Sequence, residues 1–453
     1  MDFSGKRILV FGTGISGLSA ADLLLEKGAE VVLFDGNRSL DPCRIRSHFA
    51  GKKEIELYLG DLPGEIAADL SLVVLSPGVP ADLPLVEALR ESGIPIWGEI
   101  ELAYRCSAGS LLAITGTNGK TTTTTLLGEI LSGCLPDVRV AGNIGIPYTG
   151  ILSDMTNETV TVAEISSFQL ETVVEFHPQI TAVLNITPDH LNRHHTMENY
   201  IAAKLSIAKN QTAKDICVLN YEDEILKERA DSIPARIVWF SSLSILSEGL
   251  YLDGDKIIYA HDGQREEVIV VGDLNILGRH NYENVMAAAA MALSFGVSME
   301  DLRKALRAFR AVEHRIEYVT EKRGVRFYND SKGTNPDAAI KVIQAMDRPT
   351  CLIGGGYDKD SSYKEWIECF GGKVKKLVLI GQTREKIAAE AEACGFHDYV
   401  FADSLQEAVD ICYENAETGD AVLLSPACAS WGMFPNYEVR GKMFKEIVHA
   451  LSE

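Results

Sequence analysis

The chain has 453 residues, a length that suggests about three domains. Hydrophobic residues make up 46% and charged residues 24%, a balance that excludes a disordered or fibrous protein. Its 64 acidic and 43 basic side chains give a formal net charge of -21, which disfavours nucleic acid as a partner. Nine scattered cysteines without a Cys-x-x-Cys pair indicate reduced thiols in the core of the protein. No apolar run reaches the ~18 residues of a membrane span. We therefore expect a cytoplasmic protein without membrane insertion.

The predicted elements fall into three blocks that each alternate short apolar strands with amphipathic helices. The first block, residues 1–98, contains RILVFG and EVVLFD; the second, residues 99–311, contains LLAITG; the third, residues 312–453, contains GVRFYND. This alternation predicts an α/β protein with parallel sheets and crossover helices. Asp-Gly pairs within residues 245–274 predict hairpin strands added to the sheet of the second block.

A glycine-rich turn, GTGISG at Gly12 to Gly17, follows the first strand, and Asp35 ends the next strand. A G-x-G-x-x-G turn between a strand and a helix is typical of dinucleotide binding, with the diphosphate at the helix N-terminus and the carboxylate near a ribose. The same geometry accepts the diphosphate of a nucleotide sugar, and the glycines could also serve tight packing alone. The residues of this turn therefore leave an NAD-dependent oxidoreductase open.

A second glycine-rich turn lies in LLAITGTNGKTTTTT, again between an apolar strand and a helix. Ile114 stands where the standard G-x-x-x-x-G-K-[ST] loop begins with glycine, but the rest of the loop keeps the pattern that binds phosphate. The predicted phosphate ligands are Gly116, Thr117, Asn118, Gly119, Lys120, Thr121 and Thr122. We expect Mg²⁺ on these phosphates, held by Thr121 and by Glu164 at the end of the strand TVTVAE.

Three histidines follow the strand QITAVLNIT. His190 and His194 have the i, i+4 spacing of a helical zinc pair, but Leu191 replaces the glutamate of the metalloprotease motif, which disfavours catalytic zinc. We expect His190, close to the strand end, to belong to the site, and His194 and His195 to be surface residues. Helical spacing alone predicts that Lys204, in NYIAAKLSIAK, is solvated.

Together these motifs resemble the Mur ligases of peptidoglycan precursor synthesis. The resemblance covers nearly the whole chain, in order, through GTGISG, SPG, GTNGKT, GNIG, EISSFQLE, DHLNRH, YIAAK, GRHNYENVMAA, EHRIE, NDSKGTN, GGYDK and SPACASW. It implies an N-terminal Rossmann-like domain for a UDP-sugar, a central P-loop-type ATPase domain, and a C-terminal Rossmann-like domain that closes on ATP and binds an amino acid. The members most similar to this chain join D-glutamate to UDP-N-acetylmuramoyl-L-alanine.

The resemblance also implies the chemistry. ATP phosphorylates the alanine carboxylate, and the amine of D-glutamate then displaces phosphate through a tetrahedral intermediate. Two Mg²⁺ ions are implied, the first held by Thr121 and Glu164 and the second by His190 and by Lys204 after carbamylation with carbon dioxide. Only a neutral amine adds carbon dioxide, so the site must lower the pKa of Lys204.

Further contacts follow from the same resemblance. Asn281 is implied at the adenine, Arg315 at the ATP phosphates and Asp330 at the ribose. The residues implied at the UDP-sugar are Ile15, Ser16, Asp35, one of Asn37 and Arg38, Ser76, and Asn143 at the muramoyl group. The residues implied at D-glutamate are Thr334, Lys359, Ser430, Trp431 and Tyr437, with Lys332 in the same cleft; Trp431 and Tyr437 stand where relatives carry leucine and phenylalanine.

Three other interpretations remain at this point. A sister Mur ligase or folylpolyglutamate synthetase shares the central ATPase, although the latter lacks the N-terminal UDP domain. An NAD-dependent dehydrogenase would use GTGISG and Asp35 but leaves Lys120, Glu164 and Lys204 without a role. A catalytically inactive nucleotide-binding regulator is disfavoured because every catalytic position is filled. We expect a monomer.

Overall fold

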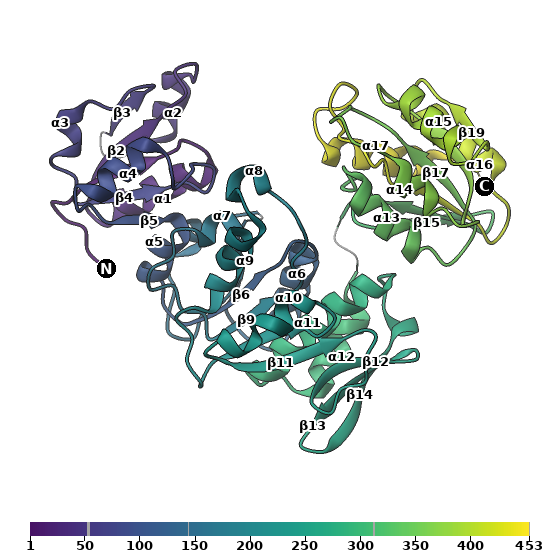
Figure 1. Cartoon of the computed structure of the whole chain (residues 1–453), viewed down its shortest axis with the longest axis horizontal. Helices are drawn as coiled ribbons and strands as arrows, with labels where there is room; N and C mark the ends of the chain where they lie inside the picture. Colours follow the sequence, from purple (N-terminus) through teal and green to yellow (C-terminus); the bar gives the residue numbers. More distant parts are fainter. Residues whose placement is uncertain (52–54, 144, 311–312, 453) are drawn as a thin grey trace. The chain divides into compact units, whose positions relative to one another are not determined.

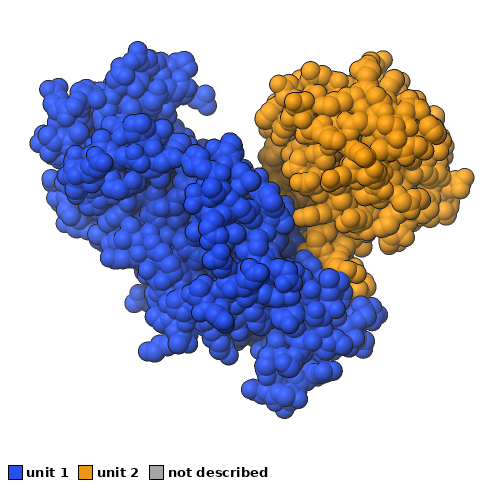
Figure 2. All heavy atoms as spheres, viewed as in Figure 1, with its two compact units in different colours: residues 1–270, 283–306 blue, residues 271–282, 307–453 orange. Residues whose placement is uncertain are grey.

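The computed structural model describes residues 1–51, 55–143, 145–310 and 313–452 (Figure 1). These residues form two compact units, coloured separately in Figure 2: residues 1–270 with 283–306, and residues 271–282 with 307–453. The first unit contains two sheets and the second contains one. The predicted boundary between residues 311 and 312 falls outside the described residues.

The first sheet has five parallel strands in the order β3-β2-β1-β4-β5. Its strands are β1 (Arg7–Phe11), β2 (Glu30–Asp35), β3 (Glu56–Leu59), β4 (Leu72–Leu75) and β5 (Ile96–Gly98), and its helices are α1 (Ile15–Glu26), α2 (Pro42–His48), α3 (Gly64–Ala67) and α4 (Pro84–Glu91). Apolar side chains cover both faces of the sheet. The strand order reverses between β1 and β4, where ligands of such sheets collect.

The second sheet has nine strands in the order β14-β13-β12-β11-β10-β9-β6-β8-β7. Its strands are β6 (Ser110–Thr115), β7 (Val138–Gly142), β8 (Val160–Glu164), β9 (Ile180–Val183), β10 (Ile216–Asn220), β11 (Arg236–Ser241), β12 (Gly249–Asp253), β13 (Lys256–His261) and β14 (Gln264–Val270). The last three pair antiparallel, which confirms the hairpins predicted within residues 245–274.

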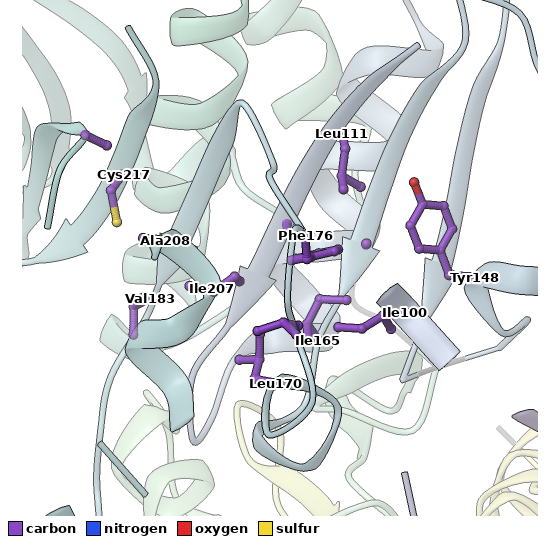
Figure 3. Close-up of a cluster of buried hydrophobic side chains, with 14 of the residues drawn as sticks. Ile100, Leu111, Tyr148, Ile165, Leu170, Phe176, Val183, Ile207, Ala208 and Cys217 are labelled. Atoms are coloured by element: carbon purple, nitrogen blue, oxygen red, sulfur yellow. The ribbon is translucent and has the colours of Figure 1, made fainter. Parts of the chain in front are cut away.

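Helices surround this sheet: α5 (Glu99–Cys106), α6 (Lys120–Ser132), α7 (Ser167–Leu170), α8 (Leu191–His194), α9 (Met197–Leu205), α10 (Glu224–Arg229), α11 (Arg279–Phe295) and α12 (Met299–Ala308). One of its buried clusters joins residues far apart in the sequence, among them Ile100, Phe176 and Cys217 (Figure 3). Side chains on both sides of β6 and β8 are buried, and β6 accordingly carries the apolar run Leu111 to Ile114.

The third sheet has six strands in the order β15-β16-β20-β17-β18-β19, of which only β15 runs antiparallel to its neighbour among the described pairs. Its strands are β15 (Glu317–Lys322), β16 (Val325–Asn329), β17 (Thr350–Gly354), β18 (Val374–Leu379), β19 (Tyr399–Phe401) and β20 (Ala421–Leu424). Its helices are α13 (Pro336–Ala345), α14 (Lys364–Glu368), α15 (Arg384–Ala393), α16 (Leu405–Asn415) and α17 (Tyr437–Ala450).

The three sheets with their crossover helices confirm the predicted α/β class. All nine cysteines are free, as expected, but Cys43 and Cys134 are exposed, so the prediction that the cysteines lie in the core is wrong for these two. Cys43 lies in the short helix α2, and Cys134 lies two residues beyond the end of α6. Every helix within the described residues is too short or too polar to cross a membrane.

Candidate active site

The glycine-rich turn after β6 has the backbone geometry of a phosphate-binding loop. Gly119 has a φ of +85°, and a Cβ there would lie 2.2 Å from Oδ1 of Asn284, so this position requires glycine. Helix α6 begins at the next residue, Lys120. The unpaired N–H groups and the positive dipole end of its first turn favour an anion at the loop.

Polar contacts fix this loop and its lysine. The ammonium of Lys120 donates to the carbonyl oxygens of Gly116 and Thr117, each at 2.9 Å, so it lies over the loop rather than in solvent. Asn118 N–H donates to Oδ1 of Asn185 at 2.8 Å, just beyond the end of β9. The side chains of Thr121 and Thr122 are buried in the first turn of α6.

Glu164 ends β8, beside the strand that leads into the loop, because Glu164 pairs with Ile114. Its side chain is 2% exposed, and Oε1 accepts a hydrogen bond from Nδ2 of Asn143 at 3.0 Å. Oε2 is buried and has no hydrogen-bond partner among the described residues. A buried carboxylate oxygen without a donor is costly, and a cation would satisfy it.

Lys204, near the end of α9, is 2% exposed, so the prediction from helical spacing that it is solvated is wrong. Its ammonium donates to the carbonyl oxygen of Gly116 at 2.7 Å and lies 4.7 Å from the ring centre of Tyr200. Burial, and then the charge of Lys120, lower the pKa of Lys204 to about 6. The structure thus places a weakly basic amine against the glycine-rich loop after β6.

The histidines after β9 differ from one another in burial. His190 has a left-handed backbone with a φ of 52° and a half-exposed side chain whose Nε2 lies 3.5 Å from Oδ2 of Asp189. His194 is buried against Ser167, with 2.9 Å between Nε2 and Oγ, so the prediction that it lies on the surface is wrong. Burial is the main cause that lowers the pKa of His194 to about 4. His195 is exposed, as expected.

The GTGISG turn is tied to the ends of the neighbouring strands. The Asp35 carboxylate accepts the N–H and the hydroxyl of Thr13, each at 2.9 Å, and the Ser76 hydroxyl donates to Gly12 O at 3.3 Å. Ile15 is 75% exposed and Ser16 is half-buried, at the start of α1. In the adjacent loop Asn37 accepts the N–H of Ser39 at 3.0 Å, and Arg38 forms an ion pair with Asp61.

The remaining predicted residues lie in the second unit, most of them in loops after three adjacent strands. Asp330, Lys332 and Thr334 follow β16; Lys359 follows β17; Ser430, Trp431 and Tyr437 follow β20. Since β20 pairs in parallel with both β16 and β17, the three loops emerge at one edge of the sheet. The structure therefore brings these residues to a common edge.

Asp330 is the most buried acid of this edge. Its carboxylate is 4% exposed and accepts the Ser425 hydroxyl at 2.8 Å, and burial raises its pKa to about 7. Arg315 carries a buried Nε without a hydrogen-bond partner among the described residues. Asn281 is buried and donates to Leu277 O at 2.7 Å.

Two arginines that the sequence did not single out each join two segments near the predicted site residues, one in each unit. Arg440 is fully buried and donates to Ser331 Oγ, Ser331 O and Cys428 O at 2.9, 2.7 and 3.2 Å, joining the loops after β16 and β20. Arg193, in α8, donates to Glu171 at 2.7 Å and to Val79 O at 3.0 Å, joining α8 to the loop after β4. In the sequence both resemble ordinary helix charges. Arg193 falls inside the motif DHLNRH, whereas Arg440 lies outside every motif quoted above, so nothing in the sequence pointed to it.

A surface cavity of about 320 Å³ in the second unit, between β15 and α17, contains none of the predicted site residues. Its charges pair with one another: Lys445 lies 2.5 Å from Glu313 and 2.9 Å from Glu317.

Within the described ranges, no three histidine, cysteine or acidic side chains gather as they would around a metal ion.

Comparison with known proteins assigns the whole chain to one family. Three family models match: Mur ligase MurD-like, N-terminal domain, at residues 6–98; Mur ligase middle domain at 114–292; and Mur ligase, glutamate ligase domain, at 314–428. The chain is 55% identical to UDP-N-acetylmuramoylalanine–D-glutamate ligase of Lachnoclostridium phytofermentans and 52% identical to that of Lachnospira eligens, with 100% of each chain covered.

Solved structures share the fold at lower identity. UDP-N-acetylmuramate-alanine ligase MurC of Thermotoga maritima has a TM-score of 0.59 and 19% identity, over 98% of this chain and 99% of the other. MurF ligase of the same organism, in complex with ADP, has a TM-score of 0.58 and 17% identity, over 99% and 96%. Because the chain is more than 50% identical to a ligase of this family over its full length and matches the models of all three domains, it belongs to the Mur ligase family.

Proposed function

We propose that the protein joins D-glutamate to UDP-N-acetylmuramoyl-L-alanine at the expense of ATP, giving ADP and inorganic phosphate, in the cytoplasmic stage of peptidoglycan precursor synthesis. The observation that carries this proposal is the 55% identity to a D-glutamate ligase over the full length of both chains. The protein acts as a monomer in this proposal. A sister Mur ligase activity is the alternative.

ATP occupies the phosphate loop in this proposal. The backbone from Gly116 to Thr122 receives the phosphates, and Lys120, which already lies over the loop, neutralises charge on the transferred phosphoryl group. Asn281, Arg315 and Asp330 contact the adenine, the phosphates and the ribose. The buried Nε of Arg315, which has no partner among the described residues, supports an anionic ligand at that side chain.

The residues around the loop fit magnesium. Thr121 and Glu164 hold a first ion, and the unpartnered Oε2 of Glu164 supports this role. His190 and Lys204 hold a second ion after the Lys204 amine bonds to the carbon of carbon dioxide and loses a proton, which leaves a carbamate anion. The lowered pKa of Lys204 supports this step because it keeps the amine neutral near pH 7. Bound Mg²⁺ supplies charge neutralisation to the phosphates.

The nucleotide sugar binds at the reversal point of the first sheet. Ile15, Ser16, Asp35, Ser76 and one of Asn37 and Arg38 contact its UDP part, and Asn143 contacts the muramoyl group. Its alanine carboxylate takes the γ-phosphoryl group of ATP, since hydroxide is a poor leaving group and phosphate a good one. The amine of D-glutamate then attacks the acyl carbon, and phosphate leaves from the tetrahedral intermediate.

D-glutamate binds at the edge formed by the loops after β16, β17 and β20. Lys359 provides the charge for a carboxylate, Thr334 and Ser430 provide hydroxyls, and Trp431 and Tyr437 border the site. Lys332 lies 5.6 Å from the ring centre of Tyr437 and adds a second positive charge. Two cations and two hydroxyls suit a substrate with two carboxylates.

Phosphate release tests the proposal directly. The protein is incubated with ATP, Mg²⁺ and UDP-N-acetylmuramoyl-L-alanine, and D-glutamate is compared with L-glutamate, L-lysine and meso-diaminopimelate. Release that depends on D-glutamate alone is the expected result. Release with another of these amino acids would identify a sister ligase, and NADH binding without any release would restore the dehydrogenase hypothesis.

A further inference from the structure

The loops after β17 and β20 are joined along their backbones in the second unit. Gly355 N–H donates to Pro426 O at 2.8 Å, and Tyr357 N–H donates to Ala429 O at 2.9 Å. A Cβ at Gly356 would lie 2.4 Å from Ala429 O, so only glycine allows this approach. The pairing brings the side chains of Tyr357 and Trp431 together.

These two aromatic side chains form an exposed pair. Their ring centres lie 5.6 Å apart at an interplanar angle of 66°, an edge-to-face contact. Trp431 is 54% exposed, whereas Trp366 is fully buried and the other two tryptophans are half-buried. An indole exposed to this extent gains little from apolar burial, so packing alone does not account for it.

The indole faces the ammonium of Lys359, which lies 5.3 Å from its ring centre, within the range of a cation–π interaction. Lys359 makes no hydrogen bond or ion pair with any other residue that the structure describes. The two acids that flank it are turned to another cation, since Asp358 and Asp360 lie 3.3 and 3.6 Å from Lys386. The ring therefore directs this ammonium while leaving its N–H donors available to a ligand.

We propose that Trp431 is a positioning residue that holds Lys359 for the distal carboxylate of the amino-acid substrate and so contributes to the selection of an acidic amino acid. This inference rests on the proposed function and adds to it a role that leucine at the same position would not provide. Leucine is also apolar, but it is smaller, and only an aromatic face attracts a cation through its quadrupole.

The test compares Trp431→Leu and Trp431→Phe with the wild-type enzyme in the phosphate-release assay. An exposed cation–π contact predicts that Trp431→Leu raises the KM for D-glutamate about two- to fivefold, with a smaller rise in Trp431→Phe and no change in the KM for ATP. Phe401→Leu is the matched control: it removes an exposed ring below the Arg384 guanidinium, 5.5 Å away, outside the site. This control is expected to leave both KM values unchanged.

A double-mutant cycle separates positioning from a merely structural effect. If Trp431 acts through Lys359, Trp431→Leu has no further effect on the D-glutamate KM in a Lys359→Met background. An additive rise in the double variant, an equal rise in the ATP KM, or an unchanged D-glutamate KM in Trp431→Leu would overturn the inference. Absence of D-glutamate-dependent release by the wild-type enzyme would instead overturn the proposed function, and this inference with it.

Discussion

Replacement of Asp330 by asparagine is expected to stabilise the second unit while it weakens ATP binding. The carboxylate is 4% exposed, and burial raises its pKa from 3.8 to about 7 against the opposing effects of Ser425 and Arg315. Each pKa unit corresponds to about 1.36 kcal/mol, so the ionised side chain costs on the order of 4 kcal/mol at pH 8. Asparagine keeps an acceptor for the Ser425 hydroxyl and carries no charge.

The pH dependence has a definite sign. Because the folded-state pKa is raised above the unfolded value, the native protein binds more protons between pH 4 and 7, and its stability falls as the pH rises through that window. Above pH 7 the cost is constant. The stability difference between Asp330→Asn and wild type should therefore grow by on the order of 1 kcal/mol from pH 6 to pH 8.

Urea unfolding, followed through the fluorescence of buried Trp366 in the same unit, measures this difference at both pH values. Asp337→Asn serves as the control, because Asp337 is an exposed acid in the first turn of α13. A difference that stays constant between pH 6 and pH 8, or that matches the Asp337→Asn control, would refute the claim that Asp330 is ionised at a cost. The phosphate-release assay then shows whether the KM for ATP rises.

The other predictions concern the phosphate loop and the amino-acid edge. Lys204→Ala should abolish most turnover, and added acetate should partly restore phosphate release; near-normal activity without acetate would exclude the carbamate role. Lys359→Ala should raise the KM for D-glutamate far more than the KM for ATP in the same assay, whereas an equal rise in both would argue against a carboxylate contact. Gly119→Ala should raise the KM for ATP at least tenfold and cost about 1–3 kcal/mol of stability, because the added Cβ would clash with Asn284 and the backbone has a φ of +85°. Gly133→Ala is the control, since Gly133 has a φ of -71° just beyond the other end of α6. Equal effects of the two substitutions would contradict this reasoning.

The family, the α/β class and the hairpins within residues 245–274 could be predicted from the sequence and are confirmed. These features depend on short-range patterns. The glycines of the loop at Gly116–Gly119 meet a local backbone requirement, and apolar runs followed by Gly, Asp or Ser mark strand ends at which ligands collect. The roles of the individual site residues remain predictions.

Burial and side-chain pairing could not be predicted in the same way, because they depend on residues distant in the chain. Lys204 has the spacing of a solvated lysine, yet its amine donates a hydrogen bond to a carbonyl oxygen 88 residues away. His194 is hydrogen-bonded to Ser167 of another helix. Arg440 reaches a loop 109 residues earlier. By itself the sequence determined the family, because the order of its motifs suffices for that, and it marked the glycine-rich turn after β6 as a candidate phosphate loop, because a tight turn depends on local backbone geometry. Only the tertiary structure decided which ionisable side chains are buried away from water. Burial by residues distant in the sequence lowers the pKa of Lys204 and raises the pKa of Asp330.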